Sequence, residues 1–304
     1  MEINKVIIPA AGLDERFLPL SKTLPKEMWP ILCKPAIHHI AQEAVDSALN
    51  TIIMVTSQRN GMIADYFDPS TAYSHLKNSD SKDHLGALDK IRKAAALVMM
   101  RQHEPLGTGH AIWLARHSLQ KEYFGVAYPD DLIVGKQPAL AQLMRVARQE
   151  KASVLAVQEV PNDCISSYGV IAIKKTITPN LFQVSQVVEK PHAKDAPSSL
   201  AIVGRYILSS KIMTTIDTMM AYDQQTISLT EAIGQLLHSN ERIFAVKVQG
   251  TRYDIGSHLG WVKAVIGTSL QDPEMGPAVR SFLSNFDTPE SFLYNPAKMI
   301  QDNF

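Results

Sequence analysis

Small residues and cations near the start of the chain have the composition of a phosphate-binding loop. After the apolar segment at residues 6–8 come the small residues Ala10, Ala11 and Gly12 and then the cations Arg16, Lys22 and Lys26. Because small side chains let a ligand approach the backbone closely, exposed N–H groups and three cations can surround a polyphosphate. Pro19 and Pro25 stiffen the same loop, which lowers the entropy cost of holding charge in place. We therefore predict a phosphate-binding role, against the alternative of three solvated surface cations.

Two acidic residues, Asp14 and Glu15, interrupt this loop. A carboxylate near a triphosphate repels it, and at about 4 Å and an effective dielectric constant near 20 one pair of unit charges is worth about 4 kcal/mol before screening. Asp also tolerates a positive φ better than most residues, although less freely than glycine. The sequence leaves open whether the two side chains turn outward or pair with Arg16 or Lys22.

Further carboxylates stand where strands and turns are expected to end. Asp130 and Asp131 follow an apolar segment, and Asp254 comes just before Gly256 and a predicted helix. Magnesium prefers hard carboxylate oxygens, usually one or two per site. The alternative for each of these residues is an ordinary turn or helix-capping aspartate.

Bulk properties exclude several classes of protein. The chain has 304 residues with 30 basic and 30 acidic side chains, and a net charge of zero argues against a generic binder of nucleic acid or acidic membranes. Cys33 and Cys164 form no CxxC pair, so we predict no zinc or iron–sulfur site and a reducing compartment. Neither a signal peptide nor an apolar run of the ~20 residues that span a bilayer is evident. We expect a cytoplasmic protein.

The elements that must position these residues alternate between strands and helices in the first half of the chain. We predict strands at 5–9, 51–56, 96–100, 124–128 and 153–160 and helices at 35–48, 60–67, 108–119 and 137–150. This alternation predicts βαβ units and a largely parallel sheet that is covered on both faces. Ligands bind at the carboxyl edge of such sheets, where the loops at 10–26, 101–110 and 128–132 would meet.

The second half is richer in strands. We predict strands at 168–173, 182–188, 200–208 and 243–248 and helices at 210–220, 227–239 and 257–270. The polar stretch at 70–95 is expected to be an excursion with some helix near its end. One continuous sheet with an appended β-rich portion fits this pattern better than two independent domains.

Several motifs resemble those of sugar-1-phosphate nucleotidyltransferases. The loop at 6–28 is similar to the signature Gly-x-Gly-Thr-Arg-x-x-Pro-x-(Thr/Ser)-x-x-x-Pro-Lys, and Pro-Lys-Glu-Met at 25–28 resembles the bacterial uridylyltransferases of this family. Further collinear matches lie at 106–111, 129–132, 168–170, 188–191, 196–206 and 253–256. So many matches in one order, over about 250 residues, are specific evidence. Asp14 and Glu15 replace the glycine and threonine of the signature, and Thr226 and Ser228 depart from a Glu-Ile-Gln-Leu-Thr pattern.

The resemblance implies an α/β fold: a Rossmann-like, three-layer arrangement with a mixed, mainly parallel sheet, helices on both faces and a β-rich sugar-binding part. It implies one domain over 1–304, with a nucleotide-binding part at about 1–135, a sugar-binding part at about 136–260 and a helical tail at 261–304. The implied reaction converts UTP and glucose 1-phosphate to UDP-glucose and pyrophosphate with Mg²⁺, by in-line attack and without a covalent intermediate. A homodimer or homotetramer is also implied.

The resemblance also assigns roles to individual residues. Catalytic roles fall to Arg16, Lys26 and Lys190, nucleotide contacts to Ala10, Ala11, Gly12, Gln102, Gly107 and Gly109, sugar contacts to Gly169, Glu189 and Lys190, and the metal to Asp130 and Asp254. The amide of Gln102 can pair with the donor–acceptor edge of uracil, and Glu189 can accept hydrogen bonds from glucose hydroxyls.

Two alternatives stay open. The first is a catalytically weak or regulatory homologue that binds UDP-glucose or an active relative, and the second is a related transferase for dTTP or another sugar 1-phosphate. A nicotinamide-dependent dehydrogenase is disfavoured because no Gly-x-Gly-x-x-Gly follows the first strand.

Overall fold

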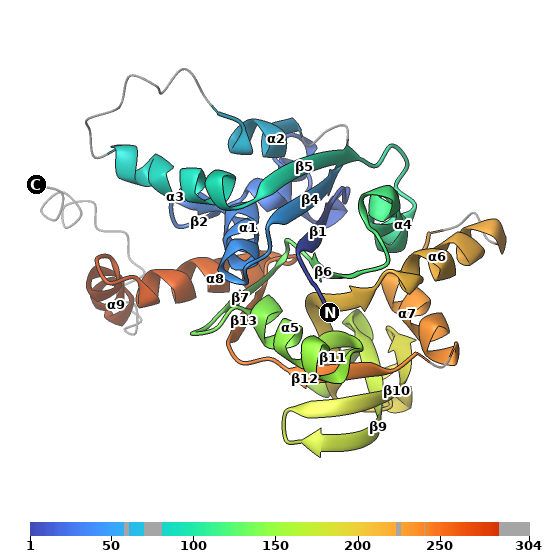
Figure 1. Cartoon of the computed structure of the whole chain (residues 1–304). Helices are drawn as coiled ribbons and strands as arrows, with labels where there is room; N and C mark the ends of the chain where they lie inside the picture. Colours follow the sequence, from blue (N-terminus) through green and yellow to red (C-terminus); the bar gives the residue numbers. More distant parts are fainter. Residues whose placement is uncertain (58–60, 70–80, 223–225, 240, 286–304) are drawn as a thin grey trace, which may run out of the picture.

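A mixed β-sheet forms the centre of the protein. The computed structural model describes residues 1–57, 61–69, 81–222, 226–239 and 241–285 (Figure 1). Among these residues nine strands form one sheet in the order β5-β4-β1-β6-β11-β8-β12-β10-β9. Their bounds are β1 Lys5–Ala10, β4 Thr51–Thr56, β5 Ala96–Arg101, β6 Tyr123–Ala127, β8 Ser153–Glu159, β9 Gly169–Thr178, β10 Leu181–Glu189, β11 Leu200–Ser209 and β12 Ile243–Lys247.

The pairing pattern divides the sheet into two halves. Strands β5, β4, β1 and β6 are parallel neighbours, as the alternation of strands and helices predicts. In the other half β11 is antiparallel to both β6 and β8, and β10 is antiparallel to β12 and β9, while β12 and β8 are parallel. The parallel half thus comes from the first part of the chain, and the antiparallel hairpin β9–β10 belongs to the β-rich part.

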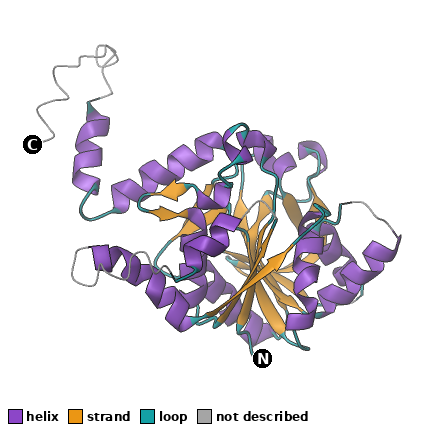
Figure 2. Ribbon diagram, turned by 90° about the horizontal axis from the view of Figure 1, so that it is seen from above, coloured by secondary structure: helices purple, strands orange, loops and turns teal. Residues whose placement is uncertain are grey.

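Helices cover both faces of the sheet (Figure 2). They are α1 Ala36–Asp46, α2 Gly61–Phe67, α3 Ser81–Ala94, α4 Gly107–Leu114, α5 Ala139–Glu150, α6 Lys211–Tyr222, α7 Leu229–His238, α8 His258–Gln271 and α9 Gly276–Ser284. Side chains of β1 alternate between two apolar clusters: Val6 and Ile8 pack on the side of α1 and α5, and Ile7 packs on the side of α4, α6 and α7. This alternation is the period of two that a strand buried on both faces requires.

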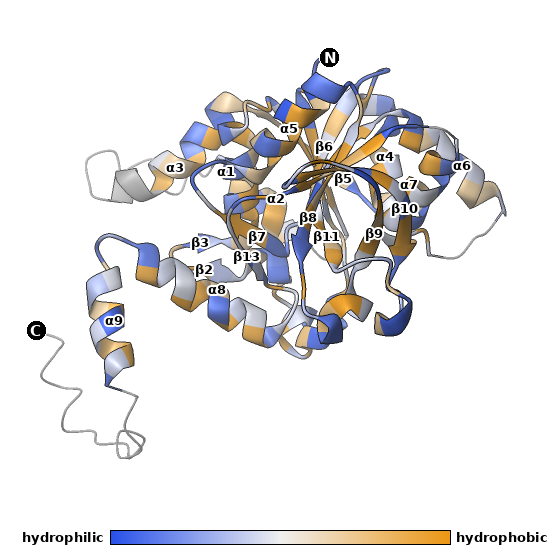
Figure 3. Cartoon of the chain, turned by 90° about the horizontal axis from the view of Figure 1, so that it is seen from below, coloured by the Kyte–Doolittle hydropathy of each residue, from blue (hydrophilic) through white to orange (hydrophobic). Residues whose placement is uncertain are grey.

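The predicted elements are present, with differences in length. The helix predicted at 108–119 ends at Leu114 and continues as a 3₁₀ turn, Ala115–Ser118, and the strand predicted at 168–173 extends to Thr178. Helix α3 supplies the helical end of the 70–95 excursion, whose residues 70–80 lie outside the described residues, as do residues 286–304 of the predicted tail. Helix α9 lies at the far end of α8, away from the sheet (Figure 3).

Four short strands were not predicted. Strands β2 (Pro30–Ile31) and β3 (Lys34–Pro35) pair with each other, and β7 (Asp131–Val134) pairs antiparallel with β13 (Thr251–Asp254). The second pair matters for the site because it places Asp254 opposite Asp131. In the part of the chain that the structure describes, no helix is long and apolar enough to cross a membrane.

The packing of α1 buries a histidine and generates a prediction about pH. His38 is 1% exposed, its Nδ1 lies 2.8 Å from the hydroxyl of Tyr66, and its Nε2 has no hydrogen-bond partner among the described residues. Burial, together with the cation Lys34, lowers the pKa of His38 to about 4. Between pH 6.5 and 4 the unfolded state therefore binds a proton that the folded state does not, so stability falls as the pH falls.

We expect the free energy of unfolding to fall from pH 7 to pH 4 by up to about 3 kcal/mol more in the wild type than in His38→Asn. Chemical denaturation at each pH measures this difference, and His103→Asn, at an exposed position, is the control. Equal losses in the wild type and His38→Asn would contradict the assignment.

Candidate active site

Two adjoining cavities open at the carboxyl edge of the sheet, where the sequence predicts that three loops meet. The first cavity has a volume of about 570 Å³ and the second about 360 Å³. Loop residues from 9–13, 102–108 and 128–130 line the second cavity. The two cavities share one wall, formed by Leu13, Lys26, Thr108, Tyr128 and Asp130. Any ligand that reaches from one cavity into the other must pass this wall.

The loop after β1 folds into short turns that bring Lys26 to the shared wall. Three 3₁₀ turns, Glu15–Phe17, Leu20–Lys22 and Lys26–Met28, follow each other, and the last begins directly after Pro25. The ring of Phe17 is buried and packs on the rings of Trp29 and His258, with ring centroids 4.3 and 4.7 Å away. Aromatic packing therefore adds to the backbone hydrogen bonds of the three turns in fixing this loop.

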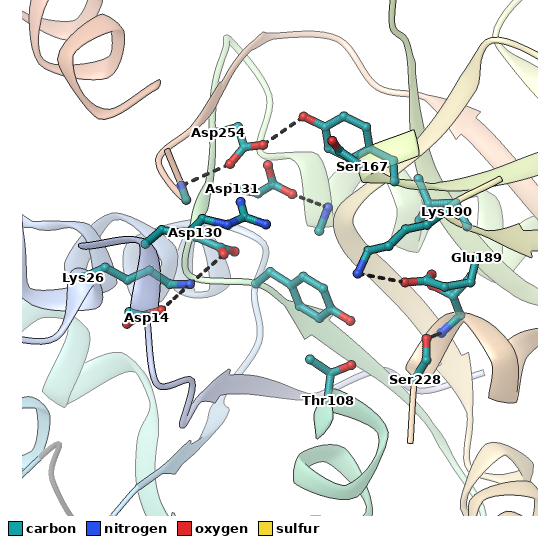
Figure 4. Close-up of a pocket in the computed structure, with 18 of the residues that line it drawn as sticks. Asp14, Lys26, Thr108, Asp130, Asp131, Ser167, Glu189, Lys190, Ser228 and Asp254 are labelled. Atoms are coloured by element: carbon teal, nitrogen blue, oxygen red, sulfur yellow. Dashed lines mark hydrogen bonds and ion pairs between the residues drawn. The ribbon is translucent and has the colours of Figure 1, made fainter. Parts of the chain in front are cut away.

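Lys26 is shared between two carboxylates. Its Nζ lies 2.7 Å from Asp14 Oδ1 and 2.9 Å from Asp130 Oδ2 (Figure 4). The Asp14 side chain is 5% exposed, and its backbone is left-handed, with φ 51° and ψ 43°, a conformation that Asp tolerates better than most residues. Neither expectation for Asp14 holds: it does not turn outward, and its partner is Lys26 rather than Arg16 or Lys22. Glu15 is exposed.

A third acidic group, Glu27, lies behind this ion pair. Burial, reinforced by the charge of Asp14, raises the pKa of Glu27 to about 8. Although burial by itself lowers the pKa of Lys26, the charges of Asp130, Glu27 and Asp14 raise it above its ordinary value. Lys26 is therefore a permanent cation, and its charge is already balanced before any phosphate binds.

The neighbouring residues Asp130 and Asp131 have different surroundings. Asp131 is buried, its Oδ2 accepts a hydrogen bond from the Gly204 amide at 2.7 Å, and its Oδ1 pairs with the Arg252 side chain. Burial raises the pKa of Asp131, whereas at Asp130 burial is outweighed by Lys26 together with a backbone hydrogen bond and the charge of Arg252, so that its pKa is lowered. Asp131 thus holds the turn in place, which is the structural alternative considered for one member of the pair, and Asp130 faces the cavities.

Asp254 faces the same space as Asp130. The hydroxyl of Tyr168 donates to Asp254 Oδ2 at 2.8 Å, and the Gly256 amide donates to Oδ1 at 3.0 Å (Figure 4). A Cβ added to Gly256 would lie 3.0 Å from Asp254 Oδ1 and 3.3 Å from Asp130 Oδ2. The missing side chain therefore leaves a gap between two carboxylates. Two hard oxygen donors facing one gap fit Mg²⁺, which commonly binds one or two carboxylates and completes its shell with phosphates and water.

The loop before α4 lines the second cavity. Gln102 is buried, and its side-chain nitrogen lies 3.1 Å from the Gly107 carbonyl, to which it donates, and 2.9 Å from His110 Nδ1. Ala11, Gly12, Gln102 and Gly107 line this cavity, whereas the side chain of Ala10 packs in the core. Gly109 is absent from the lining because it packs against Ile227, to whose carbonyl its amide donates at 2.9 Å.

The remaining predicted site residues line the first cavity. They are Arg16, Gly169, Glu189 and Lys190. Lys190 Nζ lies 3.5 Å from Glu189 Oε1, and the Lys190 side chain is 61% exposed (Figure 4). A Cβ on Gly169 would come 2.8 Å from Thr230 Cγ2, so a side chain at this position would clash with α7. Arg16 is exposed at the rim.

Sequence reasoning missed two residues that orient the acidic groups. Arg252 pairs with Asp131 and, at 3.4 Å, with Asp254, and its guanidinium lies 4.9 Å from the ring centre of Tyr168. Tyr168 in turn donates to Asp254. The only signal was position: Tyr168 is the first residue of the matched motif at 168–170, and Arg252 directly precedes the one at 253–256.

Comparisons with known proteins give one consistent result. The model of the nucleotidyl transferase family matches residues 5–267. A UTP–glucose-1-phosphate uridylyltransferase of Staphylococcus epidermidis is 39% identical over 287 residues, which cover 94% of this chain and 99% of the relative. A UDP-glucose pyrophosphorylase complexed with UDP-glucose has a TM-score of 0.81 at 31% identity and covers 89% of this chain and 100% of its own. A UTP-bound enzyme of the same name from Acinetobacter baumannii has a TM-score of 0.83 at 32% identity, with 94% and 100% covered.

The backbone of Gly107 generates a prediction about the second cavity. Its φ is +91°, and an added Cβ would lie 2.6 Å from the Ile227 carbonyl oxygen. We expect Gly107→Ala to destabilise the protein by about 1–3 kcal/mol, measured by denaturant unfolding. Gly86→Ala is the matched control, since its Cβ would meet nothing within 4 Å inside α3, and we expect it to be neutral or to stabilise by up to about 1 kcal/mol. Equal stabilities of Gly107→Ala and Gly86→Ala would contradict the inference that a side chain strains the backbone at position 107.

Proposed function

The chain belongs to the nucleotidyl transferase family, and we propose that it transfers the uridylyl group of UTP to glucose 1-phosphate, giving UDP-glucose and pyrophosphate. One observation carries the proposal: Lys26 and Asp130 lie on the wall that the two cavities share. A nucleotide sugar has its phosphates between its base and its sugar. With the base in the second cavity and the sugar in the first, those phosphates would lie at this wall.

The lining of each cavity suits its proposed occupant. Gln102 and the backbone of Gly107 border the second cavity, where an amide can complement the donor–acceptor edge of uracil. Glu189 borders the first cavity next to Gly169, and a carboxylate there can accept hydrogen bonds from sugar hydroxyls that would otherwise be buried unpaired. The names of the relatives favour UTP and glucose over other pairs.

The proposed reaction needs no protein nucleophile, because the attacking group is already anionic. An oxygen of the phosphate of glucose 1-phosphate forms a bond to the α-phosphorus of UTP, and the bond from that phosphorus to the bridging oxygen breaks. Pyrophosphate leaves with the electron pair. The barrier is repulsion between anions and their alignment, so cations and positioning supply the catalysis. In our proposal Lys26 and Arg16 neutralise the triphosphate, and Lys190 orients the attacking phosphate.

We propose Mg²⁺ as the cofactor, held by Asp130 and Asp254 in the gap beside Gly256. When bound, the ion supplies positive charge that offsets repulsion between the reacting phosphates. Hydrogen bonds from Tyr168 and the Gly256 amide fix the direction of the Asp254 carboxylate. This proposed metal ligand is therefore already oriented before the ion binds. The proposal extends to a cytoplasmic homodimer or homotetramer, which the motif resemblance implies.

An activity panel tests the substrate assignment. Pyrophosphate release with Mg²⁺ is measured for UTP and dTTP, each with glucose 1-phosphate and galactose 1-phosphate. We expect the highest kcat/KM for UTP with glucose 1-phosphate and a fall of about 100-fold or more in Asp130→Asn. Asp65→Asn, the same change on an exposed face of α2, is the control. A faster rate with dTTP or galactose 1-phosphate would replace the assignment, and binding of UDP-glucose without turnover would favour the weak homologue.

The ion pair between Asp14 and Lys26 generates a second prediction. Asn accepts the left-handed backbone of Asp14, so Asp14→Asn removes the charge and keeps the turn. We expect KM for UTP to fall about 3- to 10-fold, because Lys26 then has one carboxylate partner, Asp130, instead of two, and a phosphate competes with less negative charge for its ammonium group. Glu15→Gln removes the same charge from an exposed neighbour and should change KM less than twofold. A higher KM in Asp14→Asn would show that Asp14 supports the bound state instead.

A further inference from the structure

An arginine in the middle of β11 is completely buried beside the candidate site. Arg205 has an exposed fraction of 0%, and its partner Glu43, on α1, is 9% exposed. Arginine is almost never buried in this way unless it is paired. Neither side chain lines either cavity, and the proposed chemistry uses neither of them.

Every N–H group of the Arg205 guanidinium has a partner. Its Nε donates to the Glu43 carboxylate at 3.0 and 3.1 Å, and its Nη2 donates to Glu43 Oε2 at 2.8 Å. The remaining donors bind main-chain oxygens: Nη1 reaches the carbonyls of Tyr128 at 3.1 Å and Gly204 at 3.0 Å, and Nη2 reaches the carbonyl of Asp131 at 2.8 Å.

Two of these carbonyls bracket the turn that carries Asp130. Tyr128 ends the approach to the turn, and Asp131 begins β7 on its far side. The same strand holds the turn at a second point, since the Gly204 amide donates to Asp131 Oδ2 at 2.7 Å. A Cβ on Gly204 would come 2.6 Å from Tyr128 Cβ. The backbone of β11 therefore lies directly against this turn.

The turn is also hydrogen-bonded to the segment that carries the second acidic group, Asp254. The carbonyl of Asp130 accepts a hydrogen bond from the Ile255 amide at 2.8 Å, and Ile255 follows Asp254 in the chain. On its other side, Glu43 Oε1 accepts from the Leu140 amide at the start of α5 at 3.0 Å. The guanidinium thus connects α1, α5 and β11 to the backbone on which both acidic groups stand.

Stability alone does not account for this ion pair. Buried ion pairs often contribute no more than well-packed apolar residues of the same volume, because removing two charges from water is costly. A planar guanidinium can reach a carboxylate and separate carbonyls at once, whereas an ammonium group is a single point of charge. Arg205 is therefore suited to holding a carboxylate and several carbonyl groups in fixed relative positions.

We propose that Arg205, held in place by Glu43, is a positioning residue that fixes the turn at 128–131 and thereby places the Asp130 carboxylate for cation binding and phosphate transfer. The catalytic part of this inference rests on the proposed function. The mechanical part, that Arg205 immobilises the turn, does not.

Arg205→Lys tests both parts, since it keeps the charge and loses the fork. Hydrogen exchange followed by mass spectrometry reports on the turn without any substrate. We expect amides at 128–132 to exchange at least 10-fold faster in Arg205→Lys, with those of β4 unchanged. With UDP-glucose present, the dissociation constant of Mn²⁺, measured by electron paramagnetic resonance, should rise 5-fold or more. The value of kcat should fall 10- to 100-fold, with KM for UTP changed less than threefold.

The matched control is Ile207→Ala, a buried residue on the same strand that packs in the core. Ile207→Ala should lower the unfolding midpoint at least as much as Arg205→Lys does. Its dissociation constant for Mn²⁺ should stay within twofold of the wild-type value. Equal effects of the two variants on exchange at 128–132 and on kcat would show that Arg205 acts only through stability, which overturns the proposal.

A second variant covers the case in which Arg205→Lys does not fold. Glu43→Gln keeps Arg205 and its hydrogen bonds to carbonyls but removes the charge that holds the guanidinium. We therefore expect faster exchange at 128–132, a higher dissociation constant for Mn²⁺ and a lower kcat, each by about 3- to 10-fold. Unchanged exchange at 128–132 in Glu43→Gln would overturn the proposal. If the wild type shows no turnover, the proposed function fails, and hydrogen exchange still decides the positioning role.

Discussion

The site depends on one ammonium group that is shared between carboxylates from two different loops. Lys26 comes from the loop after β1, and Asp130 comes from the turn after β6. These strands are parallel neighbours, with Val6 opposite Gly125, so their loops leave the sheet at the same edge. The ion pair at 2.9 Å connects those loops and forms part of the wall between the two cavities. Parallel pairing of the first half of the sheet is thus a precondition for the chemistry.

The acidic residues around this wall have different roles. Asp131 and Arg252 bind each other and the backbone and serve to hold the turn. Asp130 and Asp254 face a gap that Gly256 leaves open. Burial raises the pKa of Glu27, which favours its neutral acid form and lowers the negative charge around this wall. This lower charge reduces the repulsion that a triphosphate would meet.

Much of this arrangement could be predicted from sequence, because buried strands have a clear pattern. The run at 51–56 is continuous, apolar and bounded by polar residues, and β4 spans Thr51–Thr56. Strands β7 and β13 could not be predicted because they have four residues each and contain charged residues, and because their pairing joins positions more than 100 residues apart. The same limit applied to Asp14. Sequence proximity suggested Arg16 or Lys22 as its partner, but successive 3₁₀ turns bring Lys26 back to it.

The position of Asp14 bears on affinity more than on catalytic rate. If the triphosphate has to take Lys26 from Asp14, it does so on binding, and the pair stays broken in the transition state. A penalty that is common to the bound substrate and the transition state raises KM and leaves kcat unchanged. Misplacement of Asp130 would act differently, because the alignment of the reacting phosphates matters most at the transition state. Under the proposed mechanism, the ion pair of Asp14 and the buried contacts of Arg205 would therefore affect separable kinetic quantities, although both meet at the carboxylate of Asp130 and its partner Lys26. A carboxylate in the loop after β1 is consequently compatible with an active transferase that works at a high concentration of UTP.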